Sequence, residues 1–258
     1  MCAGEIKKIS EYCDRILDLK NARLSDEYFY QSLPLCIIDA VFSIGVNYEG
    51  TRRTVIRYCN YFNLLRIRED RERIPSIRTQ ESVNKFIEKL LFIGLEKFSK
   101  EIFINEQRTS TKSGILKTEA VFRFASALKN YKVNYLQDVS KIFNSVDFEK
   151  EIKSIPGQGS GISLGYFFML SGSDDLIKPD RHILAFIKRP LGKKISIQNA
   201  QDLLPGSCKA LKLKYPHLTP RLLDHMIWRY QKSGVKHPDD EKTELNLIED
   251  EKPMDSNL

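Results

Sequence analysis

The sequence is poor in the residues that build disulfide frameworks and metal sites. Its five cysteines are odd in number and scattered, and no Cys-x-x-Cys pair occurs among them. Zinc sites and disulfide-stapled folds use cysteines in recurring, closely spaced pairs, so the sequence indicates neither. We therefore expect no metal and no cofactor.

Long apolar runs are also missing. No stretch reaches the about 20 apolar residues that a membrane-spanning helix needs. The first residues, Met-Cys-Ala-Gly-Glu followed by Lys7 and Lys8, lack the apolar centre of a secretory signal. We expect a monomer without membrane partners in the reducing cytoplasm, associated with the nucleoid if the source is bacterial.

Charge is unevenly distributed along the chain. The 258 residues carry 41 basic and 34 acidic side chains, a net charge of +7. Residues 233–258 hold eight of the acids and three of the lysines, which leaves 38 basic and 26 acidic residues in 1–232, or +12. A body this basic favours a polyanionic partner, although a soluble protein with many surface lysines would look the same. The acidic tail, 233–258, is expected to be disordered.

Segments that alternate between apolar and polar residues, as strands do, are absent too. Apolar residues instead recur at helical spacing in almost every segment. The sequence therefore predicts an all-α fold. Residues 35–46 are the most apolar of these segments and are expected to form a buried helix, with Pro34 as a break before it and a second helix over 51–63.

One stretch stands out from this helical background. Residues 155–161 read Ile-Pro-Gly-Gln-Gly-Ser-Gly, with glycine at every second position from Gly157 to Gly161. Helical patterns flank it over 147–154 and 160–170. Glycine allows a backbone with positive φ and close approach of another molecule. The free N–H groups at the start of the second helix are suited to a phosphate.

An aspartate follows this turn at a fixed distance. Asp180 comes nineteen positions after Gly161, in the sequence Lys-Pro-Asp-Arg-His. Pro179 suits the first position of a helix, which would place Asp180 in the first turn, where the helix dipole stabilises a carboxylate. An ordinary acidic residue at a helix start would show the same pattern.

The glycine turn and Asp180 together resemble the helix-hairpin-helix GPD superfamily of DNA glycosylases, which includes endonuclease III. The resemblance is firmest over residues 147–187. It implies two helical lobes flanking a cleft with the hairpin at its mouth. We place lobe A at about 26–134 and lobe B in 1–25 with 135–232, all within one domain, 1–232.

The resemblance also implies a function and a set of site residues. The implied partner is double-stranded DNA that contains a damaged or modified base. The protein would extrude this base from the duplex and release it by hydrolysing its N-glycosidic bond. Asp180 would stabilise the positively charged sugar and position water. The implied DNA-backbone contacts are Gly157, Gly159, Gly161 and Lys117, with an ordinary solvent-exposed lysine as the alternative for Lys117. Asn47 and Tyr48 would fill the gap left by the base and Tyr166 would line its pocket. The alternatives are a helix cap for Asn47 and packing in the core for Tyr48 and Tyr166.

Two departures from the family define the expected chemistry. Members with strand-cleaving activity carry a nucleophilic lysine at the position of Gly161, so its absence implies a monofunctional glycosylase. Some members bind an iron–sulfur cluster through four C-terminal cysteines, whereas this chain has only Cys208 in its second half; we expect no cluster. The alternatives are a helix-hairpin-helix protein that binds DNA without catalysis, and an RNA-binding or structural helical protein.

Overall fold

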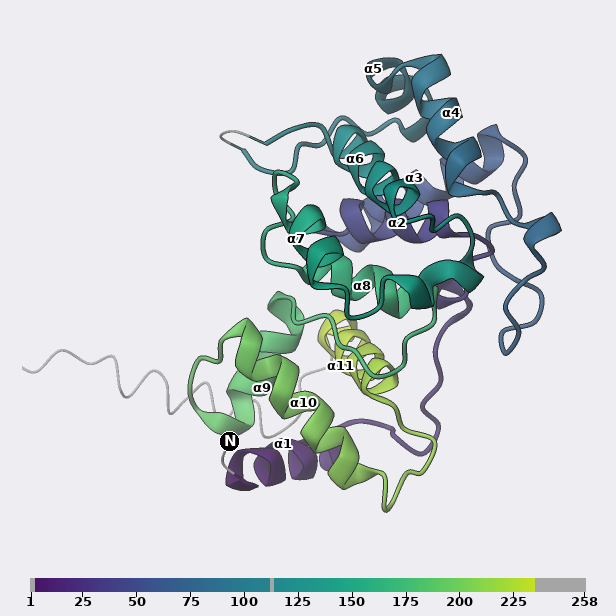
Figure 1. The fold of residues 1–258 in the computed structure, drawn as a ribbon. Helices are drawn as coiled ribbons and strands as arrows, with labels where there is room; N and C mark the ends of the chain where they lie inside the picture. The colour runs from purple at the N-terminus through teal and green to yellow at the C-terminus, as the bar shows by residue number, and fades with distance from the viewer. Residues whose placement is uncertain (1–2, 112–113, 235–258) are drawn as a thin grey trace, which may run out of the picture. The chain divides into compact units, whose positions relative to one another are not determined.

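The fold is all-α, as the sequence predicts. The computed structural model describes residues 3–111 and 114–234, and in these ranges it contains helices and two isolated β-bridges but no strand (Figure 1). None of the helices in this part of the chain is long and apolar enough to cross a bilayer. The predicted disordered tail lies almost entirely outside the described residues, which end at Gly234.

Most helices follow one another closely, but longer connections span residues 62–76 and 104–116. In chain order the helices are α1 (Ala3–Ile16), η1 (Asp26–Tyr28), α2 (Leu33–Phe42), α3 (Tyr48–Tyr61), η2 (Ile77–Thr79), α4 (Val83–Ile93), α5 (Leu95–Lys97), η3 (Phe98–Phe103), α6 (Lys117–Asn130), η4 (Leu136–Lys141), α7 (Val146–Ser154), α8 (Ile162–Ser171), α9 (Arg181–Leu191), α10 (Ile197–Leu211) and α11 (Pro220–Ser233).

The chain divides into two compact units. Unit 1 contains both ends of the chain, up to Leu24 and from Ile177, and unit 2 contains Ser25–Leu176. The expected lobe B also combines both ends of the chain, but it takes in residues 135–176 as well. Residues 135–176, including α7 and α8, belong to unit 2, because their apolar side chains pack into the same core as α2 and α6. The cleft and the hairpin at its mouth remain predictions.

Unit 2 is built around α2. All residues of this helix are buried, and it packs against α3, α4, α6 and α8. A helix that is apolar on every side is stable only when others surround it, which explains why its sequence shows no polar face. The helix begins at Leu33, so Pro34 lies in its first turn and does not interrupt it, since the first turn needs no N–H partner at proline.

Unit 1 is a smaller bundle of α1, α9, α10 and α11. Its core brings Ile9 and Cys13 of α1 against residues from the end of the chain, such as Phe186 and Leu223. The sequence suggests a break at Pro205-Gly206, but α10 is continuous there. A Cβ on Gly206 would lie 2.8 Å from Ile6 Cδ1, so this glycine allows α1 and α10 to approach closely.

Candidate functional site

The glycine-rich stretch forms the connection between α7 and α8. Two of its glycines have a left-handed backbone, Gly157 with φ +86° and Gly161 with φ +73°. Gly161 is the N-cap of α8. Positive φ is costly for residues with a Cβ, so the chain can turn from one helix into the next here because glycine occupies both positions.

Side chains of neighbouring segments also lie close to Gly157 and Gly161. A Cβ on Gly157 would lie 2.4 Å from the Cβ of Thr109, in the loop before α6. A Cβ on Gly161 would lie 2.7 Å from Lys153 Cε and 3.5 Å from its Nζ. The space of a side chain at position 161 is therefore occupied by a lysine from α7, whose ammonium pairs with Glu149 at 2.5 Å.

Gly159 differs from the other two glycines. Its φ is not left-handed, and the nearest atom to an added Cβ is Lys153 O at 3.8 Å, an ordinary contact. Gly159 and Ser160 are exposed, and their N–H groups donate no hydrogen bond within residues 3–111 and 114–234. No contact inside unit 2 therefore requires a glycine at position 159. A ligand that approaches the N–H groups of Gly159 and Ser160 closely would require one.

Asp180 is the N-cap of α9, in unit 1. Its Oδ1 accepts hydrogen bonds from the backbone N–H of His182 at 2.8 Å and of Ile183 at 3.3 Å. Asp180 is half-buried, and its Oδ2 accepts no hydrogen bond from the part of the chain that the structure describes. The helix begins at Arg181, two positions later than the sequence pattern suggests, so Pro179 precedes the helix and Asp180 caps it. One oxygen is fixed by the helix and the other is open.

A second carboxylate lies close to Asp180. Asp224 of α11 is 4% exposed, and its Oδ1 accepts the backbone N–H of Lys178 at 2.9 Å. Burial, together with the negative charge of Asp180, raises the pKa of Asp224 to about 8. His182, on the other side of Asp180, is half-buried, and its pKa is lowered by that burial and by Arg181 and nearby lysines.

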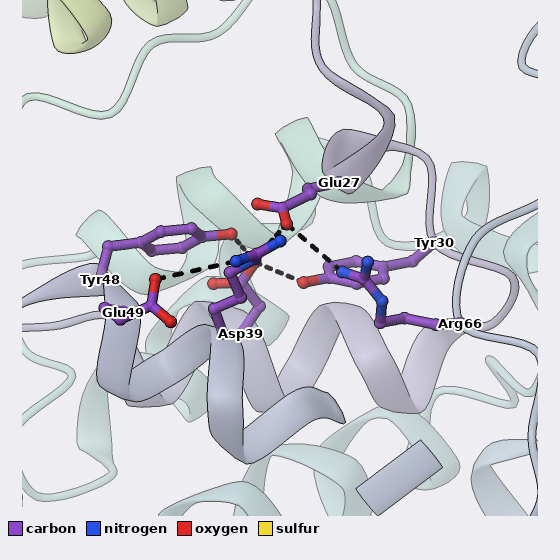
Figure 2. A network of polar contacts seen from close by, with 7 residues as sticks. Glu27, Tyr30, Asp39, Tyr48, Glu49 and Arg66 are labelled. Atoms are coloured by element: carbon purple, nitrogen blue, oxygen red, sulfur yellow. Dashed lines mark hydrogen bonds and ion pairs between the residues drawn. The ribbon is translucent and has the colours of Figure 1, made fainter. Parts of the chain in front are cut away.

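Unit 2 contains a buried carboxylate that the sequence analysis missed. Asp39 is fully buried in α2, and its Oδ2 accepts the hydroxyls of Tyr30 at 2.9 Å and Tyr48 at 3.0 Å. Figure 2 shows the two hydroxyls pointing toward each other with Asp39 between them. Burial, and then the charge of Asp39, raises the pKa of both tyrosines, so both hydroxyls stay protonated and donate.

Ion pairs cover this cluster. Glu27 of η1 contacts Arg52 of α3 and lies 3.6 Å from Arg66, and Arg52 is also 3.9 Å from Glu49 (Figure 2). The network joins η1, α2, α3 and the segment after α3. Since Asp39 is fully buried in this network, its role is structural: its hydrogen bonds hold these elements together.

Lys117 does not lie on the surface. Its side chain is 2% exposed, and its Nζ donates to the carbonyls of Phe42 and Ile44, each at 2.8 Å. These carbonyls end α2, and a lysine there satisfies groups that lack a helical partner. Neither the expected phosphate contact nor a solvent-exposed lysine agrees with this burial.

The three residues predicted near the base serve local structure. Asn47 caps α3 by accepting the N–H of Glu49 at 3.2 Å, and Tyr48 binds Asp39. Tyr166 of α8 is 4% exposed, and burial and Asp39 raise its pKa. The structure therefore brings the half-buried Tyr48 and the buried Tyr166 together around the buried Asp39.

A sequence signal for the two missed aspartates does exist. Each is an acidic residue inside an apolar helical run, Ile-Ile-Asp-Ala-Val for Asp39 and Leu-Leu-Asp-His-Met for Asp224. A charged residue in such a run is buried only with a partner. The pattern flags both positions, but the partners come from elsewhere in the chain.

Unit 2 also has a cavity of about 360 Å³. It is lined by residues of the segments around 65–76, among them Arg68, Asp70 and Ile74, and by Gln31 and Thr79. None of the predicted site residues lines it. Its two arginines are balanced by Glu69 and Asp70, so its charge does not select a ligand.

Comparison with known proteins gives a family without an assigned activity. The model of the family described as a domain of unknown function, DUF8548, matches residues 7–232. No curated protein and no solved structure matches the chain.

Proposed function

We propose that this chain, which belongs to the DUF8548 family, is a monofunctional DNA glycosylase that hydrolyses the bond between a damaged or modified base and its sugar. The observation that carries the proposal is the state of Asp180. This carboxylate is anchored through one oxygen at a helix start and keeps the other oxygen open. The exposed glycine turn that precedes it by nineteen positions supplies a site for the DNA backbone.

Asp180 would act on the sugar. Breaking the base–sugar bond develops positive charge on the ring, as in glycoside hydrolysis. An anchored carboxylate stabilises that charge without having to reorganise. Its open Oδ2 can at the same time accept a proton from an attacking water.

The glycine turn would hold a phosphate of the DNA backbone. The N–H groups of Gly159 and Ser160 are exposed and donate to no group in the described residues. Backbone N–H donors position DNA without reading its sequence. The partner on this proposal is double-stranded DNA, and its base specificity comes from other residues.

Gly161 supports hydrolysis over strand cleavage. Gly161 has no side chain, so the chain carries no nucleophilic amine at the position where the strand-cleaving members have their lysine. A Schiff-base intermediate needs a free amine at the sugar. We therefore expect an intact abasic site as the product.

The experiment is a screen of duplexes that each carry one altered base. Cleavage is assayed with and without alkali, which cuts at abasic sites. We expect strand breaks only after alkali treatment. In the Asp180→Asn variant, base release should fall by about 100-fold or more, while the Kd for the same duplex stays unchanged. Full DNA affinity with no base released from any duplex by the wild type would instead indicate a non-catalytic DNA-binding protein.

A matched pair of variants tests the glycine turn. Gly159→Ala removes no internal contact, so the fold should be retained while the added methyl hinders a phosphate at the turn. Gly165→Ala, in α8, has open space at its Cβ and serves as the control. We expect the Kd to rise about tenfold for Gly159→Ala, the equivalent of about 1.4 kcal/mol, and to stay constant for the control. Equal affinities would remove the turn from the DNA interface.

A further inference from the structure

Helix α11 holds the backbone on both sides of Asp180. Before Asp180, the carboxyl group of Asp224 accepts the N–H of Lys178 through its Oδ1 at 2.9 Å. After it, the side-chain amide of Gln231 donates to the carbonyl of His182 at 3.2 Å. The two α11 residues are seven positions apart, about two helical turns, and so share one face of the helix.

The bond to Lys178 continues to Asp180 itself. The carbonyl of Lys178 accepts the N–H of Asp180 at 2.7 Å, so the residue that Asp224 fixes is hydrogen-bonded to the aspartate that caps α9. Beyond Asp180, the His182 carbonyl held by Gln231 belongs to the same residue whose N–H binds Asp180 Oδ1 at 2.8 Å.

Resting on the proposed function, we propose that Asp224 and Gln231 are positioning residues, which fix the carboxylate of Asp180 toward the sugar of the target nucleotide. Packing alone does not account for Asp224. A carboxyl group taken out of water is costly, and an apolar side chain of similar volume is often more stable in a protein interior. What an aspartate provides at this position is an acceptor for the backbone N–H of Lys178.

The proposal is tested in single-turnover reactions of the full chain on the duplex that the wild type cuts. Asp224→Ala removes the acceptor, whereas Asp224→Asn keeps an oxygen that can accept the Lys178 N–H. A misplacement of about 1 Å costs about 100-fold in rate. We expect a loss of that order for Asp224→Ala, with most of the rate restored in Asp224→Asn and the Kd for DNA unchanged in both.

Asp14→Asn is the matched control. Asp14 is another hydrogen-bonded aspartate of unit 1, bound to Lys214 and Tyr215 away from Asp180, and its substitution should leave the rate unchanged. A wild-type rate in Asp224→Ala, or a rate in Asp224→Asn as low as that of Asp224→Ala, would overturn the proposal.

Amide hydrogen exchange separates this proposal from the proposed function. If Asp224 and Gln231 fix the segment, the amides of His182 and Ile183 lose protection in Asp224→Ala and in Gln231→Ala, while amides of α10 keep theirs. This result is expected even if the wild type releases no base. If Asp224→Ala fails to fold, Gln231→Ala alone decides: unchanged protection and rate there contradict the proposal.

Discussion

Each of the two units buries an aspartate, and the two carboxylates are held in different ways. In unit 2, Asp39 binds the hydroxyls of two tyrosines that come from either side of it in the chain (Figure 2). In unit 1, Asp224 binds one backbone N–H, that of Lys178.

The difference indicates that Asp39 stabilises the packing of helices, whereas Asp224 positions a segment of the backbone. Side-chain donors from Tyr30 and Tyr48 tie the segment after η1 and the start of α3 to the central helix, so the bonds stabilise the arrangement of helices. A backbone donor in a connector that lacks regular structure fixes the path of the chain instead. We infer that losing Asp39 would cost mainly stability, and losing Asp224 mainly the placement of Asp180.

The largest expected effect is on unit 2. Asp39→Ala leaves the buried hydroxyl of Tyr30 and the half-buried hydroxyl of Tyr48 without their acceptor, and unsatisfied buried groups cost about 1–3 kcal/mol each. We expect the free energy of unfolding to fall by about 3–5 kcal/mol, measured by urea denaturation with far-ultraviolet circular dichroism. The control is Asp147→Ala, because Asp147 is exposed and pairs with Lys150 at 3.8 Å, a contact worth less than about 1 kcal/mol. Equal losses in the two variants would contradict the role of Asp39.

The next effect is a dependence of stability on pH in unit 1. The pKa of Asp224 is raised by burial to about 8 from its ordinary value of 3.8. Between these values the folded state keeps a proton that the unfolded state has released, so the free energy of unfolding falls as pH rises. Burial also lowers the pKa of His225 from 6.5 to about 4, which has the opposite effect between those values.

The contributions of Asp224 and His225 to the pH dependence of stability therefore offset each other up to a pH near 6.5. Above that pH the contribution of Asp224 remains. We expect stability to fall toward pH 8 by up to about 1.4 kcal/mol per pH unit, followed by the fluorescence of Trp228, which lies in α11 of unit 1. In Asp224→Asn this fall should be absent. A wild-type slope retained in that variant would assign the effect to another group.

A smaller effect measures the tyrosines separately. Tyr30→Phe and Tyr48→Phe each remove one hydroxyl from Asp39 and should each lower the free energy of unfolding by about 1–2 kcal/mol. The double variant leaves the carboxylate without either donor, so its loss should exceed the sum of the two. Strict additivity would show that the two bonds are independent.

The smallest effect concerns Asn47, the N-cap of α3 and the counterpart of Asp180 in unit 2. Asn47→Ala removes the bond to the N–H of Glu49 and should cost about 1 kcal/mol of stability. The rate of base release should stay constant if Asn47 serves only as a cap. A fall in rate without a fall in stability would restore its predicted role in the gap left by an extruded base.

The sequence predicted much of the fold because its signals are local. Helical spacing of apolar residues and the alternating glycines depend on neighbours within a few positions, and the all-α fold and the turn between α7 and α8 follow from them. The interpretation of single side chains was less reliable. Lys117 looks like a surface lysine in the sequence, yet its ammonium is buried against the end of α2.

What the sequence alone determined is the all-α fold, the glycine turn between two helices and the presence of a helix start close to Asp180. Only the tertiary structure decided which of the polar residues are buried and what they bind, because the partners of Asp39, Asp224 and Lys117 lie between nine and 75 positions away. Long-range pairs of this kind depend on how helices pack, and helix packing is fixed by the whole core of a unit and not by any local pattern.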